Sequence, residues 1–532
     1  MIRVHQVKCR TPEEIEEKLL KKLKMKKGDL LSWKIRRQSV DARGHKVLFS
    51  YVIDAEVRNE QKYLKLQDVT PTPDETFRFT PTGTEPLENR PVVVGFGPAG
   101  MFAALLLAQY GYRPLIVERG SEIHKRAEKV NTFWNGGELD PECNVQYGMG
   151  GAGAFSDGKL TTRSKDKRSV KVYDELVRLG ADEKIRIEQH PHIGTDGFRI
   201  ILDNLRKDIE SLGGEFLFDT RLDDLVVEDG RLKAIALSDG RTIGCEALIF
   251  AAGHSASDTL KMVMKRGVKA RSKPYAIGVR IEHLQDFINR AMLGDSADNP
   301  LLLPARYQLT YTASTGRGVY SFCMCPGGYV IAASSAPQSL VVNGMSYSKR
   351  EGTNANSALL VQTNPGKDLP EEEAIAAGLA LQEDIERKAW EVTKSYKAPV
   401  QLAKDFIEGK VSDHFEQVKP TYPEAIGTVF ADLNTILPKE VCLSLKEGLL
   451  NFEKKVPGFL DGALLTGVET RSSSALRLDR DSDSLQSAIA GFYPCGEGSG
   501  YAGGIMTSAI DGLRCAMALM STFDRPARGN VK

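Results

Sequence analysis

Three glycines and one acid carry the clearest chemical signal in this 532-residue chain. Gly95, Gly97 and Gly100 follow a short run of valines and precede an apolar helical stretch. In such a motif the first glycine permits a tight turn, the second lets the backbone approach a pyrophosphate, and the third lets the helix pack on the strand. Glu118 lies 18 residues after Gly100, near the offset at which an acid accepts a hydrogen bond from a ribose 2′-hydroxyl. The pattern predicts a dinucleotide site and argues against a 2′-phosphate.

Two further glycine-rich stretches favour contact with the same ligand. In residues 144–160 many small residues let the main chain press against a flat ligand and direct N–H groups toward it, although a mobile loop is the alternative. Residues 491–512 again join a strand to glycines and then to a helix of small residues. Glu497 in that segment can accept a hydrogen bond from a ribityl hydroxyl, and the helix offers N–H groups to the ring edge. We therefore expect the first glycine motif and the C-terminal segment to bind opposite ends of one dinucleotide.

Two histidines and two cysteines are the candidate catalytic residues. His192 and His283 are candidate general acids or bases because an unperturbed imidazole titrates near neutral pH. Cys323 and Cys325 can form a redox pair with a flavin, but their spacing differs from the usual CxxC, and buried inert thiols are the alternative. The His-Pro-His sequence at 190–192 has no ligand cluster of metal-binding spacing near it, so no metal site is expected.

The sequence divides into units that would position these residues. We expect a small basic α/β domain over residues 1–75, a linker rich in Pro and Thr over 76–90, and a nucleotide-binding domain whose first part spans 91–264 and whose last part spans 486–525. Residues 265–485 are expected to form an inserted α+β cap domain of short strands and polar helices that holds the substrate. The predicted fold class is therefore α/β, with a Rossmann-like nucleotide-binding domain.

Composition narrows the function classes. Lys and Arg number 71 against 70 Asp and Glu, so the overall charge gives no bias toward nucleic acid or anionic membrane. Residues 1–70 hold 17 basic and 10 acidic residues, but no base-reading motif accompanies this surplus, which favours a solvated surface over an RNA site. Eight scattered cysteines indicate reduced thiols in the cytoplasm. No apolar stretch reaches the length of a membrane span, so we expect no membrane partner.

Taken together, the sequence resembles the FAD-binding flavoproteins of the glutathione-reductase type. More narrowly, it is similar to a bacterial and chloroplast family of uncharacterised FAD-dependent dehydrogenases. The stretches that carry this narrower resemblance are 144–160, 190–196, 280–283, 320–329, 343–347, 469–473 and 493–506. The resemblance implies FAD, with Glu118 on the adenosine ribose. The residues expected to contact FAD are Gly95, Gly97, Pro98, Ala99, Gly100, Glu118, Arg119, Gly150, Gly151, Ala152, Ser156, Gly253, Gly496, Glu497, Gly503, Gly504 and Ile505.

Three functions are open at this point. The first is an FAD-dependent oxidoreductase that transfers a hydride between the flavin and a small molecule held between the nucleotide-binding and cap domains. The second is a flavin monooxygenase that uses NAD(P)H as a transient co-substrate, because no second glycine motif marks a nicotinamide domain. The third is a flavoprotein whose basic N-terminal module binds RNA or a protein. Arg317, Arg350 and Arg471 are candidate ligands for a substrate carboxylate or phosphate, or else paired arginines.

Overall fold

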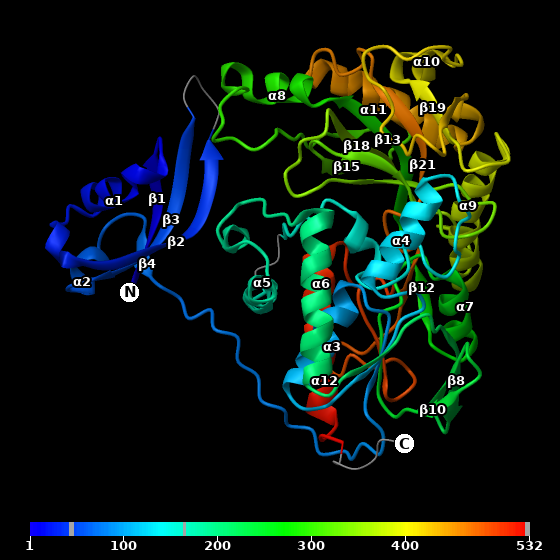
Figure 1. Ribbon diagram of the computed structural model, residues 1–532, viewed down its shortest axis with the longest axis horizontal. Coiled ribbons are helices and arrows are strands. Elements are labelled where there is room, and N and C mark those ends of the chain that lie inside the picture. Colours follow the sequence, from blue (N-terminus) through cyan, green and yellow to red (C-terminus); the bar gives the residue numbers. More distant parts are fainter. Residues whose placement is uncertain (42–46, 163–165, 527–532) are drawn as a thin grey trace.

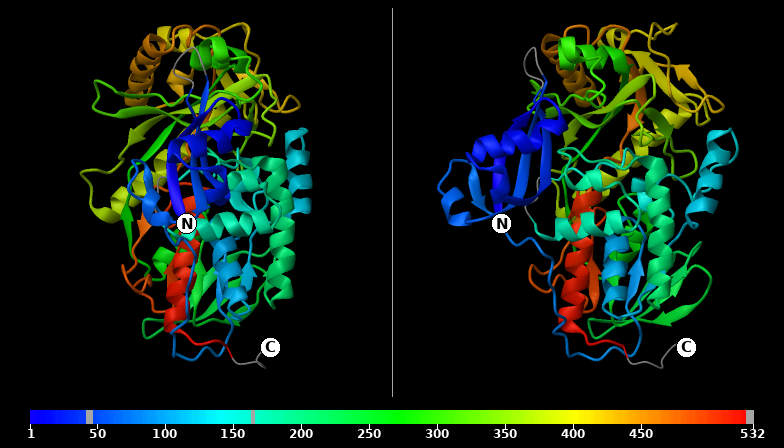
Figure 2. Two further views of the ribbon diagram at one scale, coloured as in Figure 1. Left: turned by 90° about the vertical axis from the view of Figure 1, so that its left-hand side faces the viewer. Right: turned by 60° about the vertical axis from the view of Figure 1, so that its left-hand side comes forward.

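The computed structural model describes residues 1–41, 47–162 and 166–526 (Figure 1). A small N-terminal domain stands beside a larger body, in which a nucleotide-binding domain and a second α+β domain lie one above the other (Figure 2). Among the described residues, no helix has the length and apolarity needed to cross a membrane.

The N-terminal domain is a four-stranded sheet with strand order β2-β3-β1-β4. One face of the sheet is covered by the amphipathic helix α1, whose Ile15, Leu19 and Leu23 are buried against the strands. Gln38 in β2 donates its backbone N–H to the Ile187 carbonyl at 2.6 Å, which ties this domain to the body. The elements are β1 (Ile2–Cys9), α1 (Ile15–Leu23), β2 (Leu30–Asp41), β3 (Leu48–Val57), α2 (Glu60–Tyr63) and β4 (Val69–Pro71), with 3₁₀ turns at Pro12–Glu14 and Lys27–Asp29.

An extended segment connects this domain to the body. It runs down the side of the molecule and ends close to the C-terminal helix (Figure 1). Glu85 forms an isolated bridge with Phe523, and a Cβ at Gly83 would lie 2.3 Å from the Phe523 carbonyl oxygen. Only glycine fits at this close approach.

The nucleotide-binding domain is built on a parallel five-stranded sheet with order β23-β11-β5-β6-β7. All of its short strands except the edge strand β7 consist of buried residues, as expected for strands covered on both faces. The elements of its first part are β5 (Val92–Val94), α3 (Pro98–Gln109), β6 (Leu115–Val117), α4 (Ile123–Trp134), α5 (Arg168–Arg178), α6 (Gly194–Ser211), β7 (Glu215–Leu217), β8 (Leu222–Glu228), β9 (Arg231–Leu237), β10 (Thr242–Gly244), β11 (Leu248–Phe250) and α7 (Ser257–Lys265), with 3₁₀ turns at Gly151–Phe155 and Glu183–Arg186. The chain returns to this sheet with β23 (Phe492–Pro494) and α12 (Ile505–Thr522).

Successive residues of strand β5 point to opposite faces of the sheet and join different hydrophobic cores. Val93 joins the core formed with α3, α6 and α12, whereas Val92 and Val94 join the core shared with α7 and the three-stranded sheet β10-β9-β8. Helices α3 and α12 pack so closely that a Cβ at Gly512 would lie 2.1 Å from the Ala99 carbonyl oxygen. The result is a mixed α/β fold whose glycine motif lies at the carboxyl ends of the strands.

The second domain contains a seven-stranded sheet, which the expectation of short strands underestimated. Its order is β14-β15-β18-β13-β21-β19-β20, and β13 and β18 pair antiparallel along ten residues each. Strands β19 and β20 are parallel and flank α10. The elements are β12 (Ala270–Ser272), β13 (Tyr275–Leu284), α8 (Gln285–Leu293), β14 (Thr310–Thr312), β15 (Gly318–Cys325), β16 (Tyr329–Ala332), β17 (Val342–Met345), β18 (Asn354–Thr363), α9 (Glu371–Glu391), β19 (Ala398–Leu402), α10 (Ala403–Glu408), β20 (Thr428–Phe430), α11 (Lys439–Lys455), β21 (Leu464–Glu469) and β22 (Leu476–Leu478), with 3₁₀ turns at Gly294–Ser296 and Leu433–Thr435.

Candidate functional site

A cavity of about 460 Å³ runs from the glycine motif of the nucleotide-binding domain to the strands of the cap. At one end it is bordered by the turn after β5 and by Glu118. At the other end it is bordered by Cys323 in β15, Asn343 in β17 and Glu469 in β21. Because one cavity joins both domains, a ligand bound by the glycine motif and a second molecule beneath the cap can meet in it.

The glycine motif can be built only with glycine at two of its positions. Gly95 has φ +87°, and a Cβ there would lie 2.4 Å from the Ala251 carbonyl oxygen. A Cβ at Gly100 would lie 1.9 Å from the Gly95 carbonyl oxygen, so this residue lets α3 pack against the turn. Gly97 is different, because its Cβ would meet nothing closer than 3.7 Å. Gly97 borders the cavity just before the first turn of α3, where helix N–H groups favour an anion.

The Glu118 carboxylate ties three segments together at the end of β6. One oxygen accepts the Phe96 N–H at 2.7 Å, and the other accepts the N–H groups of Gly120 and Gly148 at 3.0 Å each. A carboxylate has about four acceptor positions, so the side chain retains capacity for a ligand hydroxyl. The acid therefore fixes the glycine motif against the second glycine-rich stretch while it faces the cavity.

The second glycine-rich stretch is shaped by a buried arginine. The Arg126 side chain in α4 is fully buried, and its guanidinium donates to five backbone carbonyl oxygens, those of Asn144, Val145, Gly148, Met149 and Gly151. Burial lowers the pKa of Arg126 to about 10, so the group is still charged at neutral pH. This one side chain binds the loop from inside and leaves the other side of the loop toward the cavity.

The C-terminal segment borders the cavity with glycines that have free space where a side chain would lie. Gly503 and Gly504 precede α12 and border the cavity, and a Cβ at either would meet no protein atom within 4 Å. Gly253, after β11, shows the same open space. The first turn of α12 also borders the cavity, so its N–H groups and the positive end of its dipole face the ligand space.

Two polar atoms that border this space have no protein partner. Gln146 Nε2 and His254 Nε2 are buried and form no hydrogen bond with the described residues, although both side chains line the cavity. Such atoms are expected to find a partner in a ligand or water, since an unsatisfied buried donor is costly. Together with the open glycines, they show that the cavity fits a large polar ligand such as FAD.

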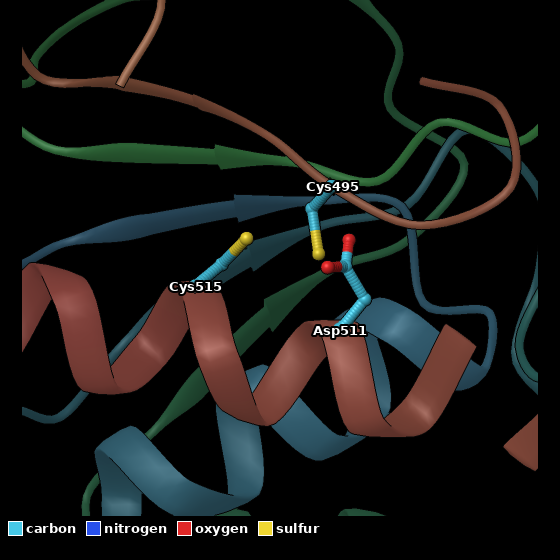
Figure 3. A group of neighbouring side chains, drawn as sticks. All are labelled: Cys495, Asp511 and Cys515. Carbon is cyan, nitrogen blue, oxygen red and sulfur yellow. The ribbon is translucent and has the colours of Figure 1, made fainter. Parts of the chain in front are cut away.

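The C-terminal segment also contains three potential metal ligands. Cys495, Asp511 and Cys515 come together between β23 and α12 (Figure 3), with ligand atoms within 4.8 Å of one another. Asp511 already accepts hydrogen bonds from both terminal nitrogens of Arg480, at 2.7 and 3.0 Å, and Arg480 Nη1 lies 3.3 Å from Cys515 Sγ. Because a guanidinium provides the positive charge here, the group ties α12 to the sheet, and we assign it no metal.

The cap end of the cavity carries charged groups. Lys159, just after the glycine-rich loop, borders the cavity, with Nζ 4.0 Å from Cys323 Sγ and 3.4 Å from Asp157. Arg280 in β13 is fully buried and pairs with Glu469 at 3.0 Å. Burial raises the pKa of Glu469 to about 7 despite this pair.

The second acid at the cavity is Glu497, near the open glycines. Burial also raises the pKa of Glu497 to about 7, whereas it lowers the pKa of neighbouring His254 to about 4. The His254 Nδ1 atom lies 4.0 Å from Glu497 Oε1. At neutral pH the imidazole is therefore uncharged, and Glu497 is close to its titration midpoint.

Most of the residues expected to contact FAD border the cavity. The exceptions are Gly100, which packs against the turn, and Gly150, whose Cβ would lie 2.5 Å from Leu202. Those that border it are Gly95, Gly97, Pro98, Ala99, Glu118, Arg119, Gly151, Ala152, Ser156, Gly253, Gly496, Glu497, Gly503, Gly504 and Ile505.

Of the four candidate catalytic residues, the structure places only Cys323 in the cavity wall. Cys323 borders the cavity, and Cys325 is buried two residues further along β15. His283 and His192 are not in the cavity wall: His283 packs on Phe459 and bonds its carbonyl oxygen at 2.8 Å, and His192 bonds the Ser348 carbonyl oxygen at 3.0 Å.

The three candidate arginines all have acidic partners. Arg350 pairs with Asp157, Arg471 with Glu386 and Arg317 with Glu440. The first two pairs are buried, so their charges are already compensated inside the protein.

Sequence reasoning missed Arg126, Lys159, His254 and Glu469. His254 had a usable signal, because it follows a predicted strand at the sheet edge where ligands bind in α/β folds.

Comparison with known proteins shows relatives of both the body and the N-terminal domain. Residues 274–472 match the family described as FAD-dependent protein, C-terminal domain-like, and residues 1–56 match a domain of unknown function. A Clostridium beijerinckii protein, named only "Uncharacterized protein", is 44% identical over 519 residues, which is 96% of each chain.

Solved structures align with lower similarity. Iminodiacetate oxidase from Chelativorans sp. BNC1 is 13% identical with a TM-score of 0.36, over 83% of this chain and 98% of that chain. L-Proline dehydrogenase from P. horikoshii is 12% identical with a TM-score of 0.32, over 83% of this chain and 94% of that chain.

Proposed function

This chain belongs to the family of the Clostridium beijerinckii protein, and we propose that it is an FAD-dependent oxidoreductase that transfers a hydride between the flavin and a small molecule. The matching C-terminal domain is that of FAD-dependent proteins, and FAD is the cofactor. The observation that carries the proposal is the single cavity shared by the glycine motif and the cap strands.

We assign the ends of the cofactor to the two glycine segments. The backbone at Gly97 and the first turn of α3 would hold the pyrophosphate, and Glu118 would accept a hydrogen bond from the adenosine ribose. The backbone at Gly503 and Gly504, with the first turn of α12, would lie along the flavin. This arrangement supports the glutathione-reductase type of FAD binding that the sequence resembles.

Chemistry then takes place where the cap covers the cavity. Bound FAD supplies a hydride acceptor or donor, while the protein supplies orientation and exclusion of water. Asn343 offers a hydrogen-bond donor to a substrate between the domains, and Glu469 and Glu497 are carboxyl groups that exchange a proton near neutral pH. We infer a small polar substrate from this wall.

Two alternative functions and the cellular location remain from the sequence analysis. The flavin monooxygenase that uses NAD(P)H transiently, and the RNA- or protein-binding flavoprotein, gain no specific feature among the described residues. We also propose a cytoplasmic location, from the eight scattered cysteines of the sequence.

The test begins with the purified protein and its visible spectrum. We expect bound FAD at about one per chain, released on denaturation and measured by absorbance. Anaerobic mixing with NADH and then NADPH, followed by a panel of small amines, hydroxy acids and enoates, should bleach the flavin with one of these donors or reoxidise it with one of these acceptors. A protein that takes up no FAD, even when refolded with an excess, would contradict the proposal.

A further inference from the structure

Cys323 and Cys325 lie at the end of β15, where the strand is irregular. The pairing of β15 with β18 shifts register between Phe322 and Cys325, and Cys323 has φ +44°. Such bulges redirect side chains at functional sites. Here Cys323 borders the cavity, whereas Cys325 is buried behind it, with its Sγ atom 3.3 Å from the Cys323 carbonyl oxygen.

Two cations face this pair from different elements. Lys159 Nζ lies 4.0 Å from Cys323 Sγ, and Arg280 Nη2 lies 3.7 Å from Cys325 Sγ and 3.1 Å from the Cys323 carbonyl oxygen. Among the acids near the pair, Asp157 and Glu469 are themselves paired with Arg350 and Arg280, and Glu497 borders the same cavity and interacts electrostatically with Cys323. The pair therefore lies in a cationic environment inside the protein.

The two thiols are electrostatically unequal. A hydrogen bond from the Cys325 thiol, aided by Lys159 and Arg280, lowers the pKa of Cys323 to about 5 against the effect of burial. The same hydrogen bond and burial raise the pKa of Cys325 well above its usual value. A thiolate beside a neutral thiol is the arrangement of a dithiol that exchanges electrons.

We propose that Cys323 and Cys325 form a second redox centre, which exchanges two electrons with FAD in the shared cavity by making and breaking an S–S bond. This inference rests on the proposed function, because FAD is the redox partner. When the S–S bond breaks, Cys323 leaves as a thiolate and Cys325 takes one proton, while FADH₂ is oxidised to FAD and the second proton passes to solvent. In the reverse direction the same two electrons return to FAD.

A cysteine outside the cavity wall provides a contrast. Cys442 in α11 is not in the cavity wall, its thiol contacts the Leu437 carbonyl oxygen at 3.6 Å, and burial raises its pKa to about 11. It is therefore the matched control for a thiol that takes no part in electron exchange.

The experiment counts electrons and thiols in the FAD-loaded protein. The holoenzyme is oxidised with diamide, freed of reagent and titrated anaerobically with dithionite while the flavin absorbance is followed. We expect about four electrons per flavin for the wild type and C442S, and about two, a twofold loss, for C323S and C325S. Peptide mapping is independent of activity: trypsin releases Gly318–Lys349, which contains both cysteines and no other, and oxidation should make this peptide lighter by two hydrogens.

The possible outcomes separate the two proposals. A wild-type holoenzyme that binds FAD but accepts only about two electrons, and whose Gly318–Lys349 peptide keeps both free thiols, would overturn the redox pair and leave the proposed oxidoreductase standing. A protein that binds no FAD would overturn both. If the serine variants fail to fold, the wild-type peptide mass and electron count decide alone.

Discussion

Replacing the buried Arg126 with lysine should weaken FAD binding without changing any residue that lines the cavity. The guanidinium donates to five backbone carbonyl oxygens of the loop over residues 144–151. A lysine ammonium has three N–H donors, so at least two of the five carbonyl oxygens lose their side-chain donor. The Gly148 carbonyl oxygen also accepts the Gly151 N–H at 2.9 Å, so one or two of these oxygens become unsatisfied. At about 1–3 kcal/mol for each buried unsatisfied group, the loop conformation is destabilised by about 1–6 kcal/mol.

The expected effect on the cofactor follows from that range. If FAD binds the loop only in the observed conformation, and the apoprotein populates that conformation no more than its alternatives, a loss of about 2 kcal/mol raises Kd by up to about 30-fold, and larger losses raise it further. Kd would be measured by quenching of FAD fluorescence on adding apoprotein. Hydrogen exchange across residues 144–158 would report whether the loop opens.

A surface arginine supplies the control for this experiment. Arg387 in α9 is half exposed and pairs with Asp384 and Glu391, so R387K should change stability by less than about 0.5 kcal/mol and leave Kd unchanged. An R126K protein that binds FAD within threefold of the wild type, with unchanged exchange in the loop, would refute the reasoning that the guanidinium holds this segment.

Three further outcomes test other parts of the site. In G503L the leucine side chain enters open space at the cavity, so FAD binding should weaken about 10- to 100-fold in a fluorescence titration while the melting temperature of the apoprotein stays unchanged. The control variant G28L should change neither quantity. Equal FAD affinities of G503L and the wild type would contradict the assignment of Gly503 to the FAD site. D157N leaves the buried Arg350 cation without its carboxylate and should lower the urea-derived free energy of unfolding by about 3–5 kcal/mol. Iodoacetamide labelling of Cys323, followed by peptide mass, should rise with pH through a midpoint near 5, because the thiolate is the reactive form; a midpoint near 9 would contradict the low pKa.

Local rules were sufficient for the elements around the glycine motif. The valine run at 92–94, the turn at Gly95 and the following helix are coded by neighbouring residues, so their pattern is visible in the sequence. Asp229-Gly230 is a dipeptide typical of hairpin turns, and here both residues have positive φ, +49° and +72°, and join β8 to β9.

The long cap strands were hidden because their buried residues include charges. Strand β13 is almost fully buried, yet it contains Arg280, Glu282 and His283. Its sequence is therefore typical of a polar, exposed segment. Each of these side chains has a partner that is distant in sequence: Arg280 pairs with Glu469, Glu282 with Thr421, and His283 Nε2 with the Phe459 carbonyl oxygen. A sequence pattern cannot supply such partners, since they are set by tertiary contacts.

In the candidate site, too, the features set by neighbouring residues were predictable, and those set by long-range contacts were not. Backbone contacts need glycine at fixed spacings, and these spacings located the glycine segments of the cavity wall. Lys159 and Cys323 lie more than 160 residues apart in sequence and only 4.0 Å apart in space, so their electrostatic relationship could not be inferred from spacing. His192 and His283 were chosen by residue type alone, which does not specify whether a side chain reaches a cavity.

The split of the nucleotide-binding domain has a consequence for synthesis. Every residue of α3 from Ala99 to Ala108 is buried, and part of that cover comes from α12, which begins about 400 residues later. At roughly 5–20 residues per second, a ribosome needs roughly 20–80 s to bridge that interval. During this time the nascent chain carries an uncovered apolar helix and half a cofactor site. The complete cavity wall, which includes Gly503, Gly504 and the first turn of α12, can therefore form only after nearly the whole chain has been synthesised.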